Sequence, residues 1–259
     1  MADPLLDVAA LQMRFGGLVA LDSVSFSMAA GSVTSVIGPN GAGKTTLFNC
    51  ITGMYRPTAG RVTFDGTDTT GARANRIARL GIARTFQNLA LFGGLTILEN
   101  LLVGAYGEGS SGLMSGAVAS RRSRVEQRRA VEAATETLDF LGLPEVADLK
   151  PNELPYGRQK QVEFARALMQ KARLVMLDEP MAGMSGPERT AMIELIERVR
   201  ARYAVGFLIV EHDVPVVMAI SDKIVVLDFG RKIAEGSAAD VQSDPAVIAA
   251  YLGTKRNKH

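Results

Sequence analysis

A glycine-rich segment that ends in lysine and threonine is the clearest chemical motif in this chain of 259 residues. Residues 38–45 read GPNGAGKT, which matches the pattern G-x-x-x-x-G-K-S/T, and they follow directly after a short apolar run at 33–37. Glycines let the backbone curl until successive N–H groups point at phosphate oxygens, and a helix expected at 45–52 adds the partial positive charge of its N-terminus. The segment therefore predicts a phosphate-binding loop for a nucleotide, formed by Gly38, Asn40, Gly41, Ala42, Gly43, Lys44, Thr45 and Thr46.

Two side chains of this loop and two carboxylates further along the chain could act on the phosphates. We expect Lys44 to reach the β- and γ-phosphates and the Thr45 hydroxyl to bind Mg²⁺. Asp178 and Glu179 follow a second apolar run at 174–177, and ligands of open α/β sheets bind at the carboxyl ends of the strands. Asp178 is therefore predicted to hold Mg²⁺, directly or through water, and Glu179 to act as the general base on the attacking water.

His212 follows a third apolar run at 207–210 and is one of only two histidines in the chain. A lone histidine at the end of a strand rarely indicates function. This strand, however, is expected in the same sheet as the other two, so the imidazole could donate to the γ-phosphate and to the attacking water. Together the motifs predict hydrolysis of a nucleoside triphosphate.

The elements that must position these residues predict an α/β fold. Short β-rich runs, the fourth at 224–227, alternate with helical patterns such as 159–171, which favours a parallel core sheet. The first 30 residues and 61–68 alternate between polar and apolar residues around an Asp-Gly turn, which predicts a small antiparallel sheet. Most of the stretch from 96 to 170 has helical periodicity, interrupted by a Gly- and Ser-rich loop expected at 104–116.

We therefore expect one domain over 1–259. Its nucleotide-binding core, with the antiparallel subdomain, is predicted to comprise 1–95 and 171–259. A helical subdomain is predicted at 96–170.

Composition excludes several classes of protein. Lys plus Arg number 29 and Asp plus Glu 27, so the formal net charge of +2 gives no strong field that would recruit nucleic acid. The single cysteine, Cys50, excludes an internal disulfide, fits a reducing compartment and is expected to be a small core residue. The uncharged run at 23–43 has about the length of a membrane span, but its glycines and proline argue against one. The arginine-rich run at 121–129 has no aromatic residue near it and predicts a solvated helix face, with contact to lipid head groups or a membrane protein as the alternative.

In this order the motifs resemble the ATP-binding cassette of an ABC transporter, over roughly residues 5–253. The segment LPYGRQ at 154–159 stands where that family has its LSGGQ signature, and RTFQN at 84–88 is similar to its glutamine loop. The resemblance implies ATP and Mg²⁺ as cofactors, with Phe15 stacked on adenine, Ala20 beside the nucleotide, Gln87 near the metal and His212 as the switch histidine. It also implies that a signature loop acts on the ATP of a second subunit, through Leu154, Pro155, Tyr156, Gly157, Arg158 and Gln159.

A closer resemblance is to the ATP-binding subunits of branched-chain amino-acid importers. It is carried by the segments at 13–21, 37–53, 84–105, 154–168, 210–213 and 251–253, and it fits the longer of the two paired ATPases of these systems. The resemblance implies an ATPase that dimerises on ATP with a second cassette and energises transmembrane permease subunits. It also implies an external solute-binding protein and a peripheral position on the cytoplasmic face of the membrane, with no nucleic-acid partner.

The sequence departs from the pattern of the family that it resembles at two places. Pro155 replaces the signature serine and offers neither a hydroxyl nor an N–H, which favours a second cassette of different sequence. Ser185 and Gly186 stand where the family more often has Asn or Asp followed by Pro.

Other functions remain open on the sequence alone. The ATPase of an ABC exporter, such as a lipopolysaccharide transporter, carries a similar cassette. A soluble non-transport ABC ATPase usually has tandem cassettes or long coiled coils, and a P-loop phosphotransferase has no use for a signature at 154–159.

Overall fold

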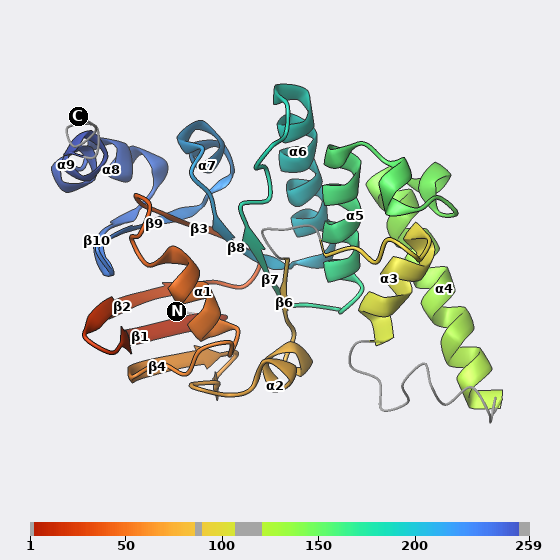
Figure 1. The fold of residues 1–259 in the computed structure, drawn as a ribbon, viewed down its shortest axis with the longest axis horizontal. Helices are drawn as coiled ribbons and strands as arrows, with labels where there is room; N and C mark the ends of the chain where they lie inside the picture. Colours follow the sequence, from red (N-terminus) through yellow and green to blue (C-terminus); the bar gives the residue numbers. More distant parts are fainter. Residues whose placement is uncertain (1–2, 86–89, 107–120, 254–259) are drawn as a thin grey trace.

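The computed structural model describes residues 3–85, 90–106 and 121–253, which form two sheets flanked by helices (Figure 1). The smaller sheet is antiparallel and has the strand order β2-β1-β4-β5. Its strands are β1 (Leu6–Phe15), β2 (Leu18–Met28), β4 (Ala59–Phe64) and β5 (Thr67–Asp68). Asp65 and Gly66 connect β4 to β5 with φ values of 48° and 73°, the conformation that a two-residue hairpin turn requires. The predicted antiparallel sheet and its Asp-Gly turn are thus confirmed.

The larger sheet has the order β10-β9-β3-β8-β7-β6, and all of its pairings are parallel except that of β9 with β10. Its strands are β3 (Val33–Ile37), β6 (Ile82–Arg84), β7 (Leu174–Asp178), β8 (Gly206–Val210), β9 (Lys223–Asp228) and β10 (Arg231–Gly236). Every residue of β3, β7 and β8 is buried, as expected for strands covered on both faces. The expected α/β class and parallel core sheet are confirmed.

Register places the chemical motifs at one edge of this sheet. Val210 of β8 pairs with Val36 of β3 on one side and with Asp178 of β7 on the other. The residues that follow these three strands are the phosphate loop, Glu179, and the pair Glu211–His212. They therefore leave the sheet next to one another, at its carboxyl edge.

Helices surround the two sheets, with α3, α4 and α5 grouped at one end of the molecule and α8 and α9 at the other (Figure 1). The α-helices are α1 (Lys44–Ile51), α2 (Ala74–Arg79), α3 (Ile97–Tyr106), α4 (Arg121–Leu141), α5 (Tyr156–Leu168), α6 (Gly186–Tyr203), α7 (Val214–Ile220), α8 (Ala238–Ser243) and α9 (Pro245–Gly253). Two single-turn 3₁₀ helices, η1 (Pro144–Val146) and η2 (Pro151–Glu153), link α4 to α5. Among the described residues, none of these helices is long and apolar enough to cross a membrane.

Helix boundaries differ from the sequence-based expectations at two places. Helix α5 covers Tyr156–Leu168 rather than 159–171, because Pro155 already provides an extended cap and Lys171 turns the chain with a φ of 51°. Residues 104–106, expected in a Gly- and Ser-rich loop, instead belong to α3. A Cβ on Gly104 would lie 2.5 Å from the Arg166 carbonyl oxygen, so glycine is needed here for close packing of α3 on α5. Residues 107–116 of that expected loop lie outside the described residues.

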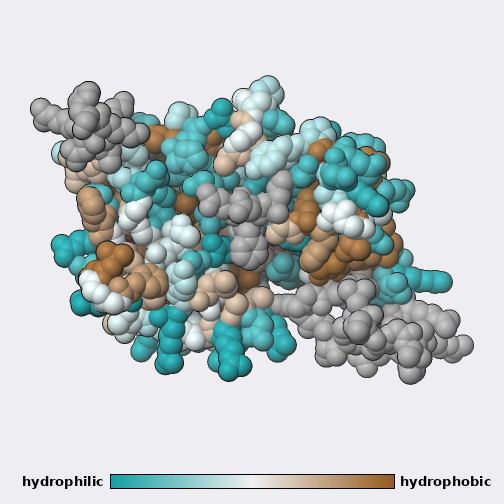
Figure 2. Space-filling model, viewed as in Figure 1, coloured by the Kyte–Doolittle hydropathy of each residue, from teal (hydrophilic) through white to brown (hydrophobic). Residues whose placement is uncertain are grey.

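The buried apolar side chains of the described residues form three clusters. One apolar cluster joins α3, α4 and α5 to the core sheet, a second joins α1 to the antiparallel sheet, and a third, smaller cluster lies beneath α8 and α9. Cys50 is buried in the second cluster, as expected. Figure 2 shows a surface on which polar side chains predominate and apolar groups occur over the antiparallel sheet and around α3 and α5. Arg128 and Arg129 of α4 are exposed, as a solvated helix face requires.

Candidate nucleotide site

The phosphate loop is held in shape by glycines that no other residue could replace. Gly38 has a φ of 152°, and a Cβ there would lie 2.1 Å from the Leu227 carbonyl oxygen. Gly43, which caps α1, has a φ of 100°, and its Cβ would lie 2.7 Å from the carbonyl oxygen of Ala20. Backbone atoms from β9 and β2 therefore pack directly against the loop, and the predicted site residue Ala20 lies beside Gly43.

Lys44 lies inside this loop. Its Nζ donates to the carbonyl oxygens of Gly38 at 2.7 Å and Pro39 at 3.0 Å. Burial lowers the pKa of Lys44, while the nearby carboxylates Glu179 and Asp178 act in the opposite direction. The predicted lysine and both predicted carboxylates are therefore close enough for their charges to attract one another. No acidic side chain occupies the first turn of α1, so the positive end of its dipole is available to an anion.

Asp178 ends β7 as a buried carboxylate and is paired with an arginine. Arg84 Nη2 donates to Asp178 Oδ2 at 2.8 Å, and Arg84 Nη1 donates to Asn49 Oδ1 on α1 at 2.6 Å. The guanidinium also lies over the Phe48 ring, 5.7 Å from its centroid. One side chain therefore connects β6, β7 and α1 beneath the phosphate loop. Arg84 belongs to the segment RTFQN, but the sequence pattern alone indicates no role for it.

Glu179 and His212 face each other at the ends of β7 and β8. Glu179 has a φ of 50°, in the left-handed region that costs a residue with a side chain about 1–3 kcal/mol. Its N–H donates to the Val210 carbonyl oxygen at 2.9 Å, which fixes this turn against β8. His212 Nδ1 is 3.9 Å from Glu179 Oε1, and the histidine side chain is 62% exposed. The sequence-predicted base and histidine are brought together.

Glu211 is a further residue of this region that sequence reasoning did not single out. Its buried side chain accepts hydrogen bonds from the backbone N–H groups of Met181 and His212, both at 3.0 Å. It therefore ties the chain after β7 to the chain after β8. The only signal in the sequence is its position beside His212.

The six residues of the expected signature lie together on the loop before α5 and on its first turn. Leu154 is buried, its carbonyl oxygen accepts from Gln159 Nε2 at 2.8 Å, and Arg158 donates to the Gly142 carbonyl oxygen at 3.3 Å. Pro155 is the N-cap of α5 and supplies no side-chain cap. The Tyr156 ring approaches to 3.2 Å of the position that a Cβ on Gly183 would take.

A carboxylate from α6 reaches the same turn. Glu188 accepts from the backbone N–H and the hydroxyl of Ser185 at 2.8 and 2.7 Å, and also from the Gly157 N–H. These hydrogen bonds lower the pKa of Glu188. Glu188 thus bonds to the first turns of both α6 and α5, a contact that the sequence pattern did not indicate.

The expected adenine side of the site is aromatic. Phe15 is 43% exposed and meets Tyr55 edge to face with ring centroids 5.3 Å apart. This pair could contact a flat base on one face. Tyr55 was not singled out in the sequence. Gln87, predicted to lie near the metal, falls outside the described residues.

The donor set fits a magnesium ion. The Thr45 hydroxyl and the Asp178 carboxylate are hard oxygen ligands, and Mg²⁺ bound with a nucleotide keeps most of its coordination for water and phosphate oxygens. The described residues contain no group of three or more His, Cys, Asp or Glu side chains that could hold a metal by themselves.

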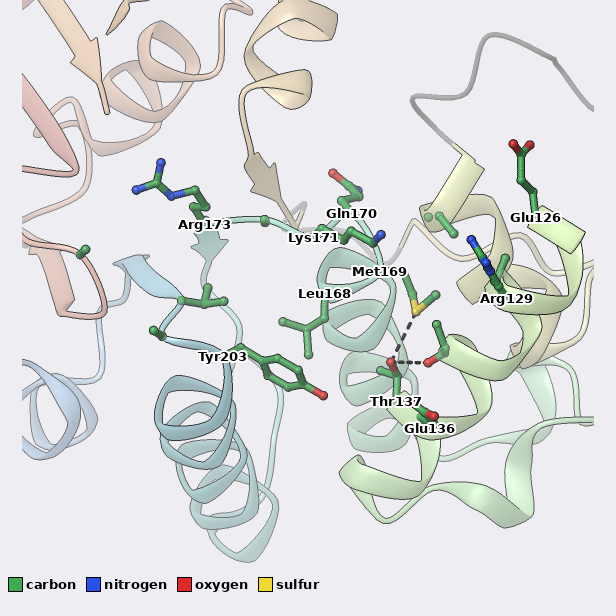
Figure 3. A pocket seen from close by; sticks show the side chains of 18 of the residues that line it. Glu126, Arg129, Glu136, Thr137, Leu168, Met169, Gln170, Lys171, Arg173 and Tyr203 are labelled. Carbon is green, nitrogen blue, oxygen red and sulfur yellow. Dashed lines mark hydrogen bonds between the residues drawn. The ribbon is translucent and has the colours of Figure 1, made fainter. Parts of the chain in front are cut away.

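A large cavity of the described structure lies elsewhere. It has a volume of about 920 Å³ and is lined by residues of α4, the end of α5, and the chain before β7 and β8, among them Met169, Arg173 and Tyr203 (Figure 3). These are the amino ends of the strands, whereas Asp178 and the phosphate loop lie at the carboxyl ends. The cavity is therefore separate from the candidate nucleotide site.

Comparison with protein families gives two matches. A model described as "ABC transporter" matches residues 21–182, and a model described as "Branched-chain amino acid ATP-binding cassette transporter" matches residues 231–256. Over 253 residues the chain is 42% identical to the high-affinity branched-chain amino acid transport ATP-binding protein BraF of Pseudomonas aeruginosa, covering 98% of this chain and 99% of that protein. It is 41% identical over 253 residues to LivG of Escherichia coli K12, a protein of the same description, with coverage of 98% and 99%.

Solved structures show the same similarity. An ABC transporter cassette crystallised in its ADP conformation superposes with a TM-score of 0.85 at 35% sequence identity, covering 97% of this chain and 100% of that one. A dimeric bacterial ABC transporter cassette superposes with a TM-score of 0.75 at 25% identity, covering 90% of this chain and 98% of that one.

Proposed function

The chain belongs to the ABC transporter family of ATP-binding cassettes, and on that premise we propose that it is the ATP-hydrolysing subunit of an importer for branched-chain or other hydrophobic amino acids. The observation that carries the proposal is the extent of the similarity to branched-chain amino acid transport ATPases, which covers nearly the whole chain and includes the tail at 231–256. Exporter ATPases and non-transport ABC ATPases share the cassette, but this combination of length and tail favours the importer.

In the proposed site, the phosphate loop and the N-terminus of α1 bind the phosphates of ATP. Lys44 lies within the loop, and its ammonium group donates to the Gly38 and Pro39 carbonyl oxygens. When ATP binds, the same group can donate to negatively charged phosphate oxygens instead. Thr45 and Asp178 would hold Mg²⁺, with Gln87 as a third contact, and the metal would neutralise charge on the phosphates. Phe15 would contact adenine.

Hydrolysis needs a base for the attacking water. Glu179 would be this base, and its φ of 50° and the hydrogen bond of its N–H to the Val210 carbonyl oxygen support the role, because both fix the turn that carries its side chain. His212 lies beside Glu179 and, being exposed, can donate to the γ-phosphate and orient the water. Because β8 pairs with both β3 and β7, these two residues follow the strands at the same edge of the sheet as the phosphate loop.

The proposed site is completed by a second cassette. Residues 154–159 contact α6 and η1 rather than the phosphate loop of their own chain, so they are available to close over ATP bound by a partner. Pro155 favours a partner of different sequence. Closure would be transmitted through Gln87 and the segment 91–95 to permease subunits in the membrane, which receive solute from an external binding protein. The chain would then lie on the cytoplasmic face of the membrane, bound through the permease.

Uptake of labelled leucine, isoleucine and valine tests the proposal. Source cells should carry as their only copy either the wild-type chain or the Lys44→Ala variant, and immunoblots should show equal abundance. We expect Lys44→Ala to lose uptake of at least one of the three amino acids. Unchanged uptake, in cells whose other carriers for these amino acids have been deleted, would refute the importer assignment.

A further inference from the structure

Arg166 connects α5, the helix whose first turn carries signature residues, to the segment 90–95 that precedes α3. Its Nη1 donates to the Ala90 carbonyl oxygen at 2.5 Å. The same guanidinium lies 5.9 Å from the centroid of the Phe92 ring, within the range of a cation–π contact. The arginine is half-buried, so water competes only partly for these contacts. One side chain of α5 therefore holds the segment 90–95 at two points.

The backbone of Arg166 also lies against α3. Helices α3 and α5 pack side by side (Figure 1), and a Cβ on Gly104 of α3 would come within 2.5 Å of the Arg166 carbonyl oxygen. Asn100, one turn earlier on α3, is fully buried. Its amide donates to the carbonyl oxygens of Phe92 and Leu95 at 3.1 and 3.3 Å, and its Oδ1 accepts from the Phe92 N–H at 2.8 Å. The segment 90–95 is thus bound to both helices.

These contacts tie the position of the segment 90–95 to the helices rather than to the core sheet. Among the described residues, hydrogen bonds join the segment to α3 and α5, and none joins it to the strands of the core sheet. Leaving buried amide and carbonyl groups unpaired is unfavourable. A displacement of α5 must therefore carry the segment with it or break the contacts of Arg166.

We propose that Arg166 is a positioning residue for transport, which transmits displacement of α5 to the segment 90–95. This inference rests on the proposed function, in which the signature residues close over the ATP of a partner and the segment 91–95 relays that closure to the permease. Arg166 lies outside the proposed nucleotide site, so its loss should leave ATP hydrolysis intact. Its loss should weaken the use of that hydrolysis to drive uptake.

Uptake and hydrolysis measured in the same proteoliposomes test this role. The vesicles should contain the complete transporter purified from source cells, with permease and second cassette, and receive its external binding protein with a labelled branched-chain amino acid. Arg166→Met keeps an apolar side chain but removes the charge and the donors. We expect the number of solute molecules taken up per ATP hydrolysed to fall by about 3- to 30-fold, as for the loss of a coupling contact, with ATP turnover close to that of the wild type.

Arg198→Met is the matched control. Arg198 of α6 also donates to a backbone carbonyl oxygen, that of Phe140, and its guanidinium lies 4.9 Å from the centroid of the Phe140 ring. The same kinds of contact are therefore lost, but none of them involves the segment 90–95. We expect the wild-type ratio of uptake to hydrolysis in Arg198→Met. Arg166→Lys, which keeps the charge and one donor group, should give a ratio between those of the wild type and Arg166→Met.

The ratio of uptake to hydrolysis separates coupling from a structural role. A wild-type ratio in Arg166→Met would overturn the proposal, even if uptake and hydrolysis both fell, because Arg166 would then be merely structural. An Arg166→Met chain that fails to fold or to assemble with the permease, while Arg198→Met does both, would overturn it as well. Wild-type vesicles that take up no branched-chain amino acid would instead refute the proposed function.

Discussion

Replacing Arg84 with methionine tests the buried ion pair between Arg84 and Asp178, the aspartate proposed to hold the metal. The guanidinium is 2.8 Å from the Asp178 carboxylate, and the two side chains are only 11% and 5% exposed. Methionine keeps an apolar stem that can still contact the Phe48 ring. It removes the charge and the donors that bind Asp178 and Asn49. Asp178 then stays buried without its guanidinium partner.

The expected loss of stability follows from this geometry. Removing one member of a buried ion pair costs about 3–5 kcal/mol, because the remaining charge stays desolvated. Loss of the hydrogen bond to Asn49 adds about 0.5–1.5 kcal/mol. We therefore expect Arg84→Met to lower the free energy of unfolding by about 3.5–6.5 kcal/mol, a large share of the about 5–15 kcal/mol by which a typical domain is stable. Asp178→Asn in the same chain removes the stranded charge, so the double variant should lose less than the sum of the two single variants.

Urea unfolding followed by circular dichroism, without nucleotide, measures these differences. Arg173→Met is the matched control, because Arg173 also pairs with an aspartate, Asp65, but both side chains are about half exposed. Such a surface pair contributes about 0–1 kcal/mol. Two results would refute the reasoning: a loss in Arg84→Met no larger than that in Arg173→Met, or strict additivity of Arg84→Met and Asp178→Asn.

Further predictions concern the base, the signature turn and the cysteine. Glu179→Gln should bind ATP like the wild type but hydrolyse it at least about 100-fold more slowly, and turnover within tenfold of the wild type in a steady-state phosphate assay would contradict its role as base. Glu188→Ala should lower the melting temperature by about 2–4 °C. The loss should be smaller in a Pro155→Ser background, because the serine hydroxyl can then cap α5 in place of Glu188. Equal losses in both backgrounds would show that Glu188 does not cap α5. Burial raises the pKa of Cys50 to about 11, so at pH 8 the thiol should react with a disulfide reagent only after unfolding in urea, and rapid reaction of the native chain would contradict this.

The parts of the fold that the sequence predicted are those whose signal is local. Strand β3 has the predicted bounds because its apolar run ends at a glycine that must leave the sheet. The phosphate loop could be predicted residue by residue because its chemistry lies in one continuous segment. The start of α5 was placed three residues too late, because periodicity begins at the first apolar residue whereas the helix begins at its cap, Pro155.

The residues that the sequence did not predict depend on pairing between distant segments. Arg84 acquires its role because β6 pairs with β7, which brings its side chain to Asp178 across 94 positions of the chain. Tyr251 packs against the cluster that contains Ile37 and Val226 only because α9 folds back over β3 and β9. Neither residue type is unusual at its position. Their contacts depend on the register of the sheet and on the path of the chain after β10, which no short pattern encodes.

The three acidic residues at the ends of β7 and β8 differ in solvent exposure and in their hydrogen-bond partners, and these differences suit them to different roles. Asp178 is 5% exposed and bound to Arg84, and Glu211 is 1% exposed and accepts from two backbone N–H groups. Glu179 is 25% exposed and lies beside His212. A general base must reach water, and of these three carboxylates Glu179 is the one with substantial exposure, on a backbone turn with a φ of 50°. The adjacent pair Asp178–Glu179 therefore divides between a buried carboxylate suited to a cation and an accessible one suited to water, although both follow the same strand.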